Sequence, residues 1–192
     1  MRNRFGLLLL CFALTASAKT ALLTNVPLVW KPTSQLQLGS MAAIDSTVRF
    51  EPFQDVRGNK EKIGENLEDK VSKPITTSGD VGAFVSAHMR ELFDKAGIKT
   101  TDGADAAVTV KGEVRQFFVT ETNTYEAQVE VEIMIVGRDG STLFKGIASG
   151  DANRFGRSYK LENYYETLSD SVVNTVSSML RSPEIQKALA GK

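Results

Sequence analysis

The stretch Y-E-A-Q-V-E-V-E-I-M-I-V, from Tyr125 to Val136, alternates between two kinds of residue. One parity is apolar throughout, whereas the other holds Glu126, Gln128, Glu130 and Glu132. Because successive side chains of a β-strand point to opposite faces, this period of two predicts a strand with one buried and one solvated face. An antiparallel sheet covered on a single face satisfies that pattern, so the rest of the chain must supply an apolar layer.

Further strands are predicted on both sides of this one. Residues 108–119 alternate in the same way, and R-D-G-S at 138–141 is a hairpin signal that leads into a third strand through Leu143 and Ile147. A short alternating stretch begins at Ile44 and ends before Pro52. A helix separates this stretch from residues 108–119, so the two strands can pair in parallel.

Two main helices are predicted to form the apolar layer. Residues 81–96 place apolar side chains three and four positions apart, between a cap at Ser78 or Asp80 and Gly97. Residues 161–180 repeat the pattern, and a short helix follows Ser182. The sequence therefore predicts an α+β fold, with a mostly antiparallel sheet of four to five strands and two main helices packed on one face.

The first eighteen residues have the pattern of a secretory signal peptide. Arg2 and Arg4 precede an apolar run from Phe5 to Leu14, and A-S-A at 16–18 is a small-residue cleavage site. We therefore expect residues 1–18 to be a signal peptide, and the mature protein to be exported to the periplasm.

Cys11 raises an alternative, which is an outer-membrane lipoprotein. A lipoprotein signal has a small residue directly before the lipidated cysteine, whereas Leu10 stands there in this chain. We interpret Cys11 as part of the apolar run, and the missing lipobox argues against a membrane anchor. Since Cys11 is the only cysteine, the mature chain would have no disulfide and no thiol nucleophile.

The mature chain is expected to divide into an arm and one domain. Residues 19–43 contain Pro27 and Pro32, which predict an N-terminal extended arm or an edge strand. Residues 44–192 are predicted to form a single α+β domain with one core. The polar tract 54–78 within it is longer than most loops, so it is functional, mobile, or contains a short strand near residues 71–75.

Composition excludes several classes of function. The chain has 23 basic and 23 acidic residues among its 192, and this balance gives no reason to expect nucleic acid as a partner. No phosphate-binding glycine motif is present. The single histidine, His88, borders the apolar stripe of its helix, so we interpret it as structural rather than as a catalytic base. We expect no cofactor, no metal site and no catalytic residue.

Two polar groups of residues have competing interpretations. The glutamates of residues 126–132 would suit a calcium site, but Lys111 and Arg115 on the neighbouring strand are natural ion-pair partners for them. Residues 153–160, N-R-F-G-R-S-Y-K, are either a plain connecting loop or a surface for a partner, because arginines and aromatic residues are common at interface hot spots. The candidate partner surface consists of Arg154, Phe155, Arg157, Tyr159 and Lys160.

Four features together carry a family resemblance over roughly residues 44–190. They are F-Q-D-V-R at 53–57, A-G-I at 96–98, the long alternating hairpin, and S-P-E-I-Q-K-A-L at 182–189. In these features and their order the chain resembles the YajG family of bacterial cell-envelope proteins. Members are typically lipoproteins with no established enzymatic activity, and the family offers no catalytic residues to transfer. The absent lipobox is a departure from that pattern.

These observations predict a non-enzymatic periplasmic or cell-envelope protein that acts as a binding or scaffolding module. Its partner would be another envelope protein or a cell-wall component. One alternative is a subunit of an oligomeric envelope assembly or transport system, including a homo-oligomer. Another is an envelope hydrolase that uses carboxylates, such as Asp55 with Glu61 or Glu65.

Overall fold

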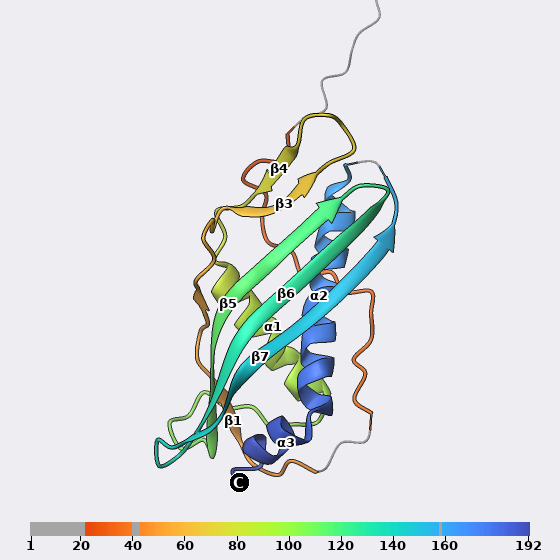
Figure 1. Cartoon of the computed structure of the whole chain (residues 1–192). Coiled ribbons are helices and arrows are strands. Elements are labelled where there is room, and N and C mark those ends of the chain that lie inside the picture. The colour runs from red at the N-terminus through yellow and green to blue at the C-terminus, as the bar shows by residue number, and fades with distance from the viewer. Residues whose placement is uncertain (1–21, 40–42, 158) are drawn as a thin grey trace, which may run out of the picture.

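A computed structural model describes residues 22–39, 43–157 and 159–192 (Figure 1). The predicted signal peptide, with Cys11, lies outside the described residues. The elements are β1 (Val48–Phe50), β2 (Gln54–Asp55), β3 (Lys62–Asn66), β4 (Lys73–Thr76), α1 (Val81–Lys95), β5 (Val108–Glu121), β6 (Thr124–Gly137), β7 (Thr142–Phe155), α2 (Leu161–Arg181) and α3 (Pro183–Leu189). Across these ranges, no helix has the length and apolarity needed to cross a membrane.

One sheet contains all the strands, in the order β4-β3-β5-β6-β7, with β1 and β2 also paired to β5. The long strands β5, β6 and β7 are antiparallel neighbours, whereas β1, β2 and β3 run parallel to β5. The predicted α+β fold is confirmed, and so is the parallel pairing across the first helix. Over the described residues the sheet has seven strands rather than four to five, because the polar tract 54–78 contains β2, β3 and β4. The short strand considered near residues 71–75 is found as β4, whereas β2 and β3 were not predicted.

Helices α1 and α2 cover the same face of the sheet, as predicted (Figure 1). The apolar parity of β6, from Tyr125 to Ile135, is buried along its whole length. Helix α2 lies especially close to β7 at Gly150, where an added Cβ would stand 2.2 Å from the amide nitrogen of Thr175. Only glycine permits this approach of helix backbone to strand backbone.

A bulge in β5 determines which of its residues face the helices. The register with β6 shifts between Val114 and Gln116. Before the shift the even-numbered Val110 and Val114 are buried, and after it the odd-numbered Phe117 and Val119 are buried. Because a bulge inserts one unpaired residue, it exchanges the two faces of the strand. Glu121 consequently lies on the inner face.

Residues 22–39 form an extended arm that contacts both a sheet edge and a helix. The amide of Val26 donates to the carbonyl of Thr76 in β4 at 2.8 Å, and the amide of Thr76 donates to the carbonyl of Leu23 at 3.0 Å. Farther along, side chains of α2 accept hydrogen bonds from arm amides. These acceptors are Ser169, Asp170 and Ser177, and the donors are Lys31, Thr33, Ser34 and Gln37.

The one-sidedness of β6 can be tested by placing a charge on each face. Val131→Asp should lower the free energy of unfolding by about 3–5 kcal/mol, because it buries an unpaired carboxylate. Glu130→Ala, on the solvated face next to it, should change that free energy by less than about 0.5 kcal/mol. Urea denaturation of both variants and wild type measures the difference. Equal tolerance at the two positions would contradict a buried inner face.

Candidate functional site

The candidate partner surface forms the connection from β7 to α2, at the end of the molecule that also carries the β3–β4 hairpin (Figure 1). Phe155 is 89% exposed, more than any other large hydrophobic residue among those described. Arg157 and Lys160 are also exposed. Arg154 and Tyr159 are partly buried. The structure therefore places three of the five predicted residues on the exposed surface and leaves two partly buried.

Ion pairs and hydrogen bonds fix this connection to four other parts of the chain. Arg154 pairs with Glu166 of α2 at 3.0 Å and donates to the hydroxyl of Thr33 in the arm at 2.8 Å. Arg157 pairs with Glu68, beyond β3, at 3.3 Å and donates to the side chain of Asn123. The backbone that presents Phe155 is thus anchored on both sides of that residue.

A buried carboxylate lies under the connection. Glu121, at the end of β5, is fully buried and accepts hydrogen bonds from the amide of Tyr159 at 2.9 Å and from the hydroxyl of Tyr164. Burial acts to raise the pKa of Glu121, but hydrogen bonds from Tyr125, Tyr164, Asn66 and the Tyr159 amide outweigh it and hold this pKa below the ordinary value. Burial, with the neighbouring Glu121 carboxylate, raises the pKa of the Tyr164 hydroxyl. The ionised carboxylate therefore joins β5, β6, α2 and the connection through its acceptor oxygens.

Tyr159 adopts a backbone conformation that is unusual for a bulky residue. Its φ is +51°, in the left-handed region where side chains with a Cβ are strained. Besides the bond to Glu121, its hydroxyl accepts from the amide of Leu23 at 3.0 Å, and the Lys73 ammonium lies 5.6 Å from its ring centroid. These contacts hold Tyr159 in its strained conformation just before α2. Sequence reasoning placed Tyr159 in the surface but missed both this conformation and Glu121.

The role of Glu121 can be tested by removing its charge and varying the pH. Glu121→Gln should lower the free energy of unfolding at pH 7 by about 1–3 kcal/mol, because charged hydrogen bonds are lost in a buried site. Since folding lowers the pKa of Glu121 from its ordinary 4.5, the ionised form stabilises the fold above about pH 4.5. That stabilisation is lost as the pH falls further. The difference in free energy of unfolding between wild type and variant should therefore become smaller in acid.

Thermal unfolding of the two proteins between pH 7 and pH 3 provides the measurement. Glu126→Gln, on the solvated face of β6, is the matched control and should show no such narrowing. A difference in stability that stayed constant with pH would mean that folding does not lower the pKa of Glu121.

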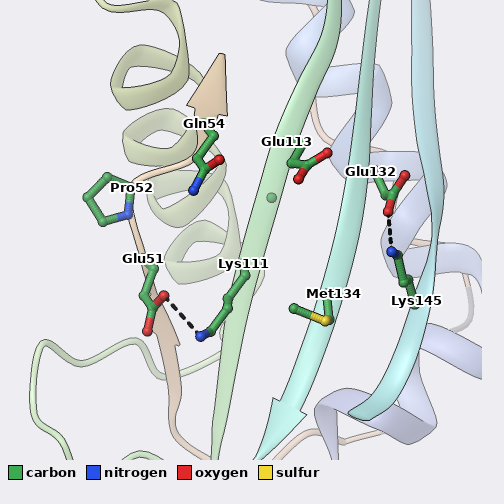
Figure 2. Close-up of a pocket in the computed structure, with 9 residues that line it drawn as sticks. Glu51, Pro52, Gln54, Lys111, Glu113, Glu132, Met134 and Lys145 are labelled. Atoms are coloured by element: carbon green, nitrogen blue, oxygen red, sulfur yellow. Dashed lines mark ion pairs between the residues drawn. The ribbon is translucent and has the colours of Figure 1, made fainter. Parts of the chain in front are cut away.

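The outer face of the sheet carries a shallow hollow of about 230 Å³ (Figure 2). It is lined by Glu51, Pro52, Gln54, Lys111, Gly112, Glu113, Glu132, Met134 and Lys145. Each charged side chain in it has an oppositely charged partner, as Lys111 does in Glu51 at 3.4 Å and Lys145 in Glu132 at 2.7 Å. The predicted pairing of Arg115 with the glutamate face is found at Glu132, whereas Lys111 pairs with Glu51 instead. A hollow with its charges already matched offers little to an ionic ligand.

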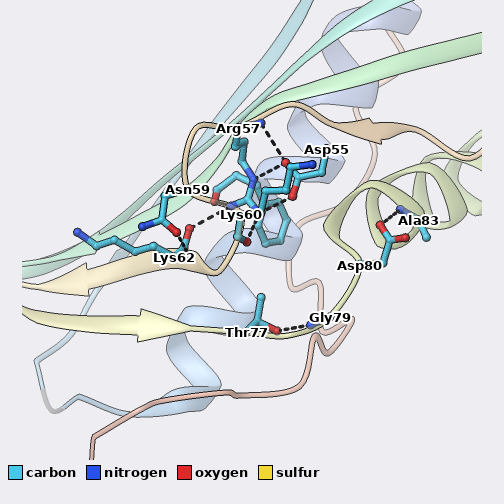
Figure 3. A network of polar contacts seen from close by, with 10 residues as sticks. Asp55, Arg57, Asn59, Lys60, Lys62, Thr77, Gly79, Asp80 and Ala83 are labelled. Atoms are coloured by element: carbon cyan, nitrogen blue, oxygen red, sulfur yellow. Dashed lines mark hydrogen bonds and ion pairs between the residues drawn. The ribbon is translucent and has the colours of Figure 1, made fainter.

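One of the carboxylates considered for a hydrolase, Asp55, lies in a polar network (Figure 3). Asp55 accepts two hydrogen bonds from the guanidinium of Arg57, with Nε–Oδ1 at 2.9 Å and Nη2–Oδ2 at 2.8 Å. Burial acts to raise the pKa of Asp55, but the bonds from Arg57 hold it below its usual value. The hydrogen bond from Lys62 likewise lowers the pKa of Glu65. Carboxylates kept ionised in this way suit a structural ion pair better than a general acid, which must carry a proton.

Arg57 uses its remaining donors to fix the segment around it. It is buried, and its guanidinium donates to the carbonyls of Lys60, Lys62 and Phe117 at 2.6, 3.1 and 3.2 Å. The network therefore joins the chain after β2 to β3 and β5. Asp55 forms no hydrogen bond with Glu61 or Glu65 among the described residues.

His88 holds the arm against α1. Its ring stacks on Trp30 with centroids 4.2 Å apart and planes at 6°, and its other contacts are the edge of Phe84 at 4.6 Å and the carboxylate of Glu91 at 3.2 Å. This position agrees with a structural role. Within residues 22–39, 43–157 and 159–192, no three His, Cys, Asp or Glu side chains gather closely enough to hold a metal ion.

Replacing His88 should loosen the arm without affecting partner binding. His88→Gln removes the stacked ring, so docking of residues 22–39 should weaken by about 0.5–1.5 kcal/mol. His88→Phe is the matched control, since it keeps an aromatic ring at the same place. Hydrogen exchange of the arm amides measures both variants. Slow exchange retained in His88→Gln would show that the stacking does not secure the arm.

Comparisons with known proteins identify the fold and no family. No family model matches the chain, and no curated protein matches it in sequence, so the resemblance to the YajG family stays a prediction. The fold is similar to that of a solved DUF330 protein from Xanthomonas campestris, with a TM-score of 0.53, 10% identity, and coverage of 88% of this chain and 94% of that one.

More distant similarities include two other solved proteins. One is a lipoprotein from Neisseria meningitidis, with a TM-score of 0.35, 11% identity, and coverage of 59% of this chain and 88% of that one. The other is the PelC dodecamer from Paraburkholderia phytofirmans, with a TM-score of 0.40, 12% identity, and coverage of 75% and 96%.

Proposed function

We propose that this protein is a non-enzymatic binding or scaffolding module of the cell envelope, and that its partner contacts the surface formed by Phe155, Arg157 and Lys160. The observation that carries the proposal is the exposure of Phe155, at 89%, on a backbone that is fixed on both sides. An aromatic ring on a preorganised backbone, here at the end of β7, loses little conformational freedom when it binds. Aromatic and arginine side chains are also the most common interface hot spots.

The envelope location in this proposal rests on the sequence. Arg2, Arg4 and the apolar run that follows them have the pattern of an export signal. The non-enzymatic part is supported by the ion pairs that engage the candidate carboxylates, especially Asp55 with Arg57. An exposed aromatic ring next to basic groups suits a partner with an apolar pocket and acidic residues around it, such as another envelope protein.

Phe155→Ala tests this surface because it should separate binding from folding. The ring is so exposed that its removal should change the free energy of unfolding by less than about 0.5 kcal/mol. If Phe155 is a hot spot, the same change should weaken binding by about 2 kcal/mol, or about thirtyfold. Val56→Ala, at another exposed apolar residue, is the matched control.

A photo-crosslinking amino acid at position 155 or 56, expressed in intact cells, identifies what each position touches. We expect a discrete crosslinked partner from position 155 and none from position 56. Affinity for the identified partner is then measured with Phe155→Ala and Val56→Ala. Equal affinities of these two variants would refute a role for Phe155.

A further inference from the structure

The sheet has two edges, of which one is covered by other parts of the chain and the other is not. On the covered side, β4 is short, contains Pro74, and forms backbone hydrogen bonds with the arm through Thr76. The N-terminal part of β5 is covered because it pairs with β1 and β2. Natural sheets cover their edges in these ways because unpaired strand backbone invites another strand.

The opposite edge is β7, which has none of this protection. It is 14 residues long, contains no proline, and keeps a regular register with β6 from Phe144 to Phe155. Figure 1 shows it as the last strand on its side of the sheet. No backbone group of the described arm, helices or loops forms a hydrogen bond with it.

The backbone groups that point away from β6 can be identified from one contact. The side-chain amide of Asn174 donates to the carbonyl of Asp151 at 2.7 Å, so this carbonyl faces outward. Because outward and inward groups alternate along an antiparallel strand, the amides and carbonyls of Lys145, Ile147, Ser149 and Asn153 face outward as well. Their side chains lie on the solvated face, where Ile147 is 51% exposed.

We propose that β7 pairs with β7 of a second copy of this chain, in antiparallel orientation about a twofold axis at Ala148. This register places Lys145, which also pairs with Glu132 of its own chain, directly opposite Asp151 of the other copy, twice by symmetry, and Ile147 opposite Ser149. Two β7 strands paired in this register therefore bring opposite charges together. The carbonyl of Asp151 has two lone pairs, so it can accept from the second strand while Asn174 remains bound. The two sheets would join into one continuous sheet.

Ser149→Pro tests the edge without breaking the sheet. The amide at position 149 faces outward, so proline removes a donor that β6 does not use. Sedimentation velocity over a concentration series should give a dimer for wild type and for the control Ser149→Ala, and a monomer for Ser149→Pro. A wild type that stays monomeric throughout, or a folded Ser149→Pro that still forms the dimer, would overturn the proposal.

Charge reversal tests the register and remains decisive if the proline variant fails to fold. Asp151→Lys places two lysines opposite each other and should weaken the dimer at least tenfold. The double variant Lys145→Asp with Asp151→Lys restores opposite charges and should regain most of that loss. A double variant as weak as the single one would refute this register. The pairing does not depend on the Phe155 surface, since Phe155→Ala should leave the dimer intact.

Discussion

The contact between α2 and β7 at Gly150 determines where most other parts of the molecule lie. An added Cβ there would stand 2.2 Å from the Thr175 nitrogen and 2.5 Å from the Ser171 carbonyl oxygen, so helix and strand meet backbone to backbone. Because the two elements are so close, the inner face of α2 covers β6 and β7. The first turns of α2 also place the Tyr164 hydroxyl against the Glu121 carboxylate. The side of α2 that faces away from the sheet remains free to hold the arm.

Helix α2 is unusual because many of its buried residues are polar. Ser169, Asp170, Ser171, Thr175 and Ser177 are all buried. The hydroxyls of Thr175 and Ser177 donate hydrogen bonds to carbonyls of their own helix. The side chains of Ser169, Asp170 and Ser177 accept hydrogen bonds from backbone amides of the arm. Since an unpaired buried polar group costs about 1–3 kcal/mol, the arm supplies hydrogen bonds that the helix needs. The arm is thus a structural part of the fold, and Trp30 on His88 fixes its other side.

The parts of this structure that the sequence predicts are those with a regular hydrophobic period. The alternation around Val131 and the three-and-four spacing of the helices predict the long strands, both main helices and the covered face. Glu121 was missed because the bulge after Val114 exchanges the faces of β5, so the alternation before the bulge does not show which residues after it are buried. The short strands of the tract 54–78 are held by Arg57, whose contacts join segments that are far apart in sequence. Such interactions leave no periodic pattern.

Two energetically unfavourable features of the fold lie at the end that presents Phe155. A carboxylate is buried there at Glu121, and Tyr159 has a left-handed backbone that is worth about 1–3 kcal/mol of strain. Among the described residues, Asn25 is the only other non-glycine with positive φ, and asparagine tolerates that region well. Apolar packing would satisfy the core at lower cost, so stability alone does not account for this arrangement. It is accounted for if the direction of the backbone at Phe155 matters, because the carboxylate and the strained tyrosine together fix that direction.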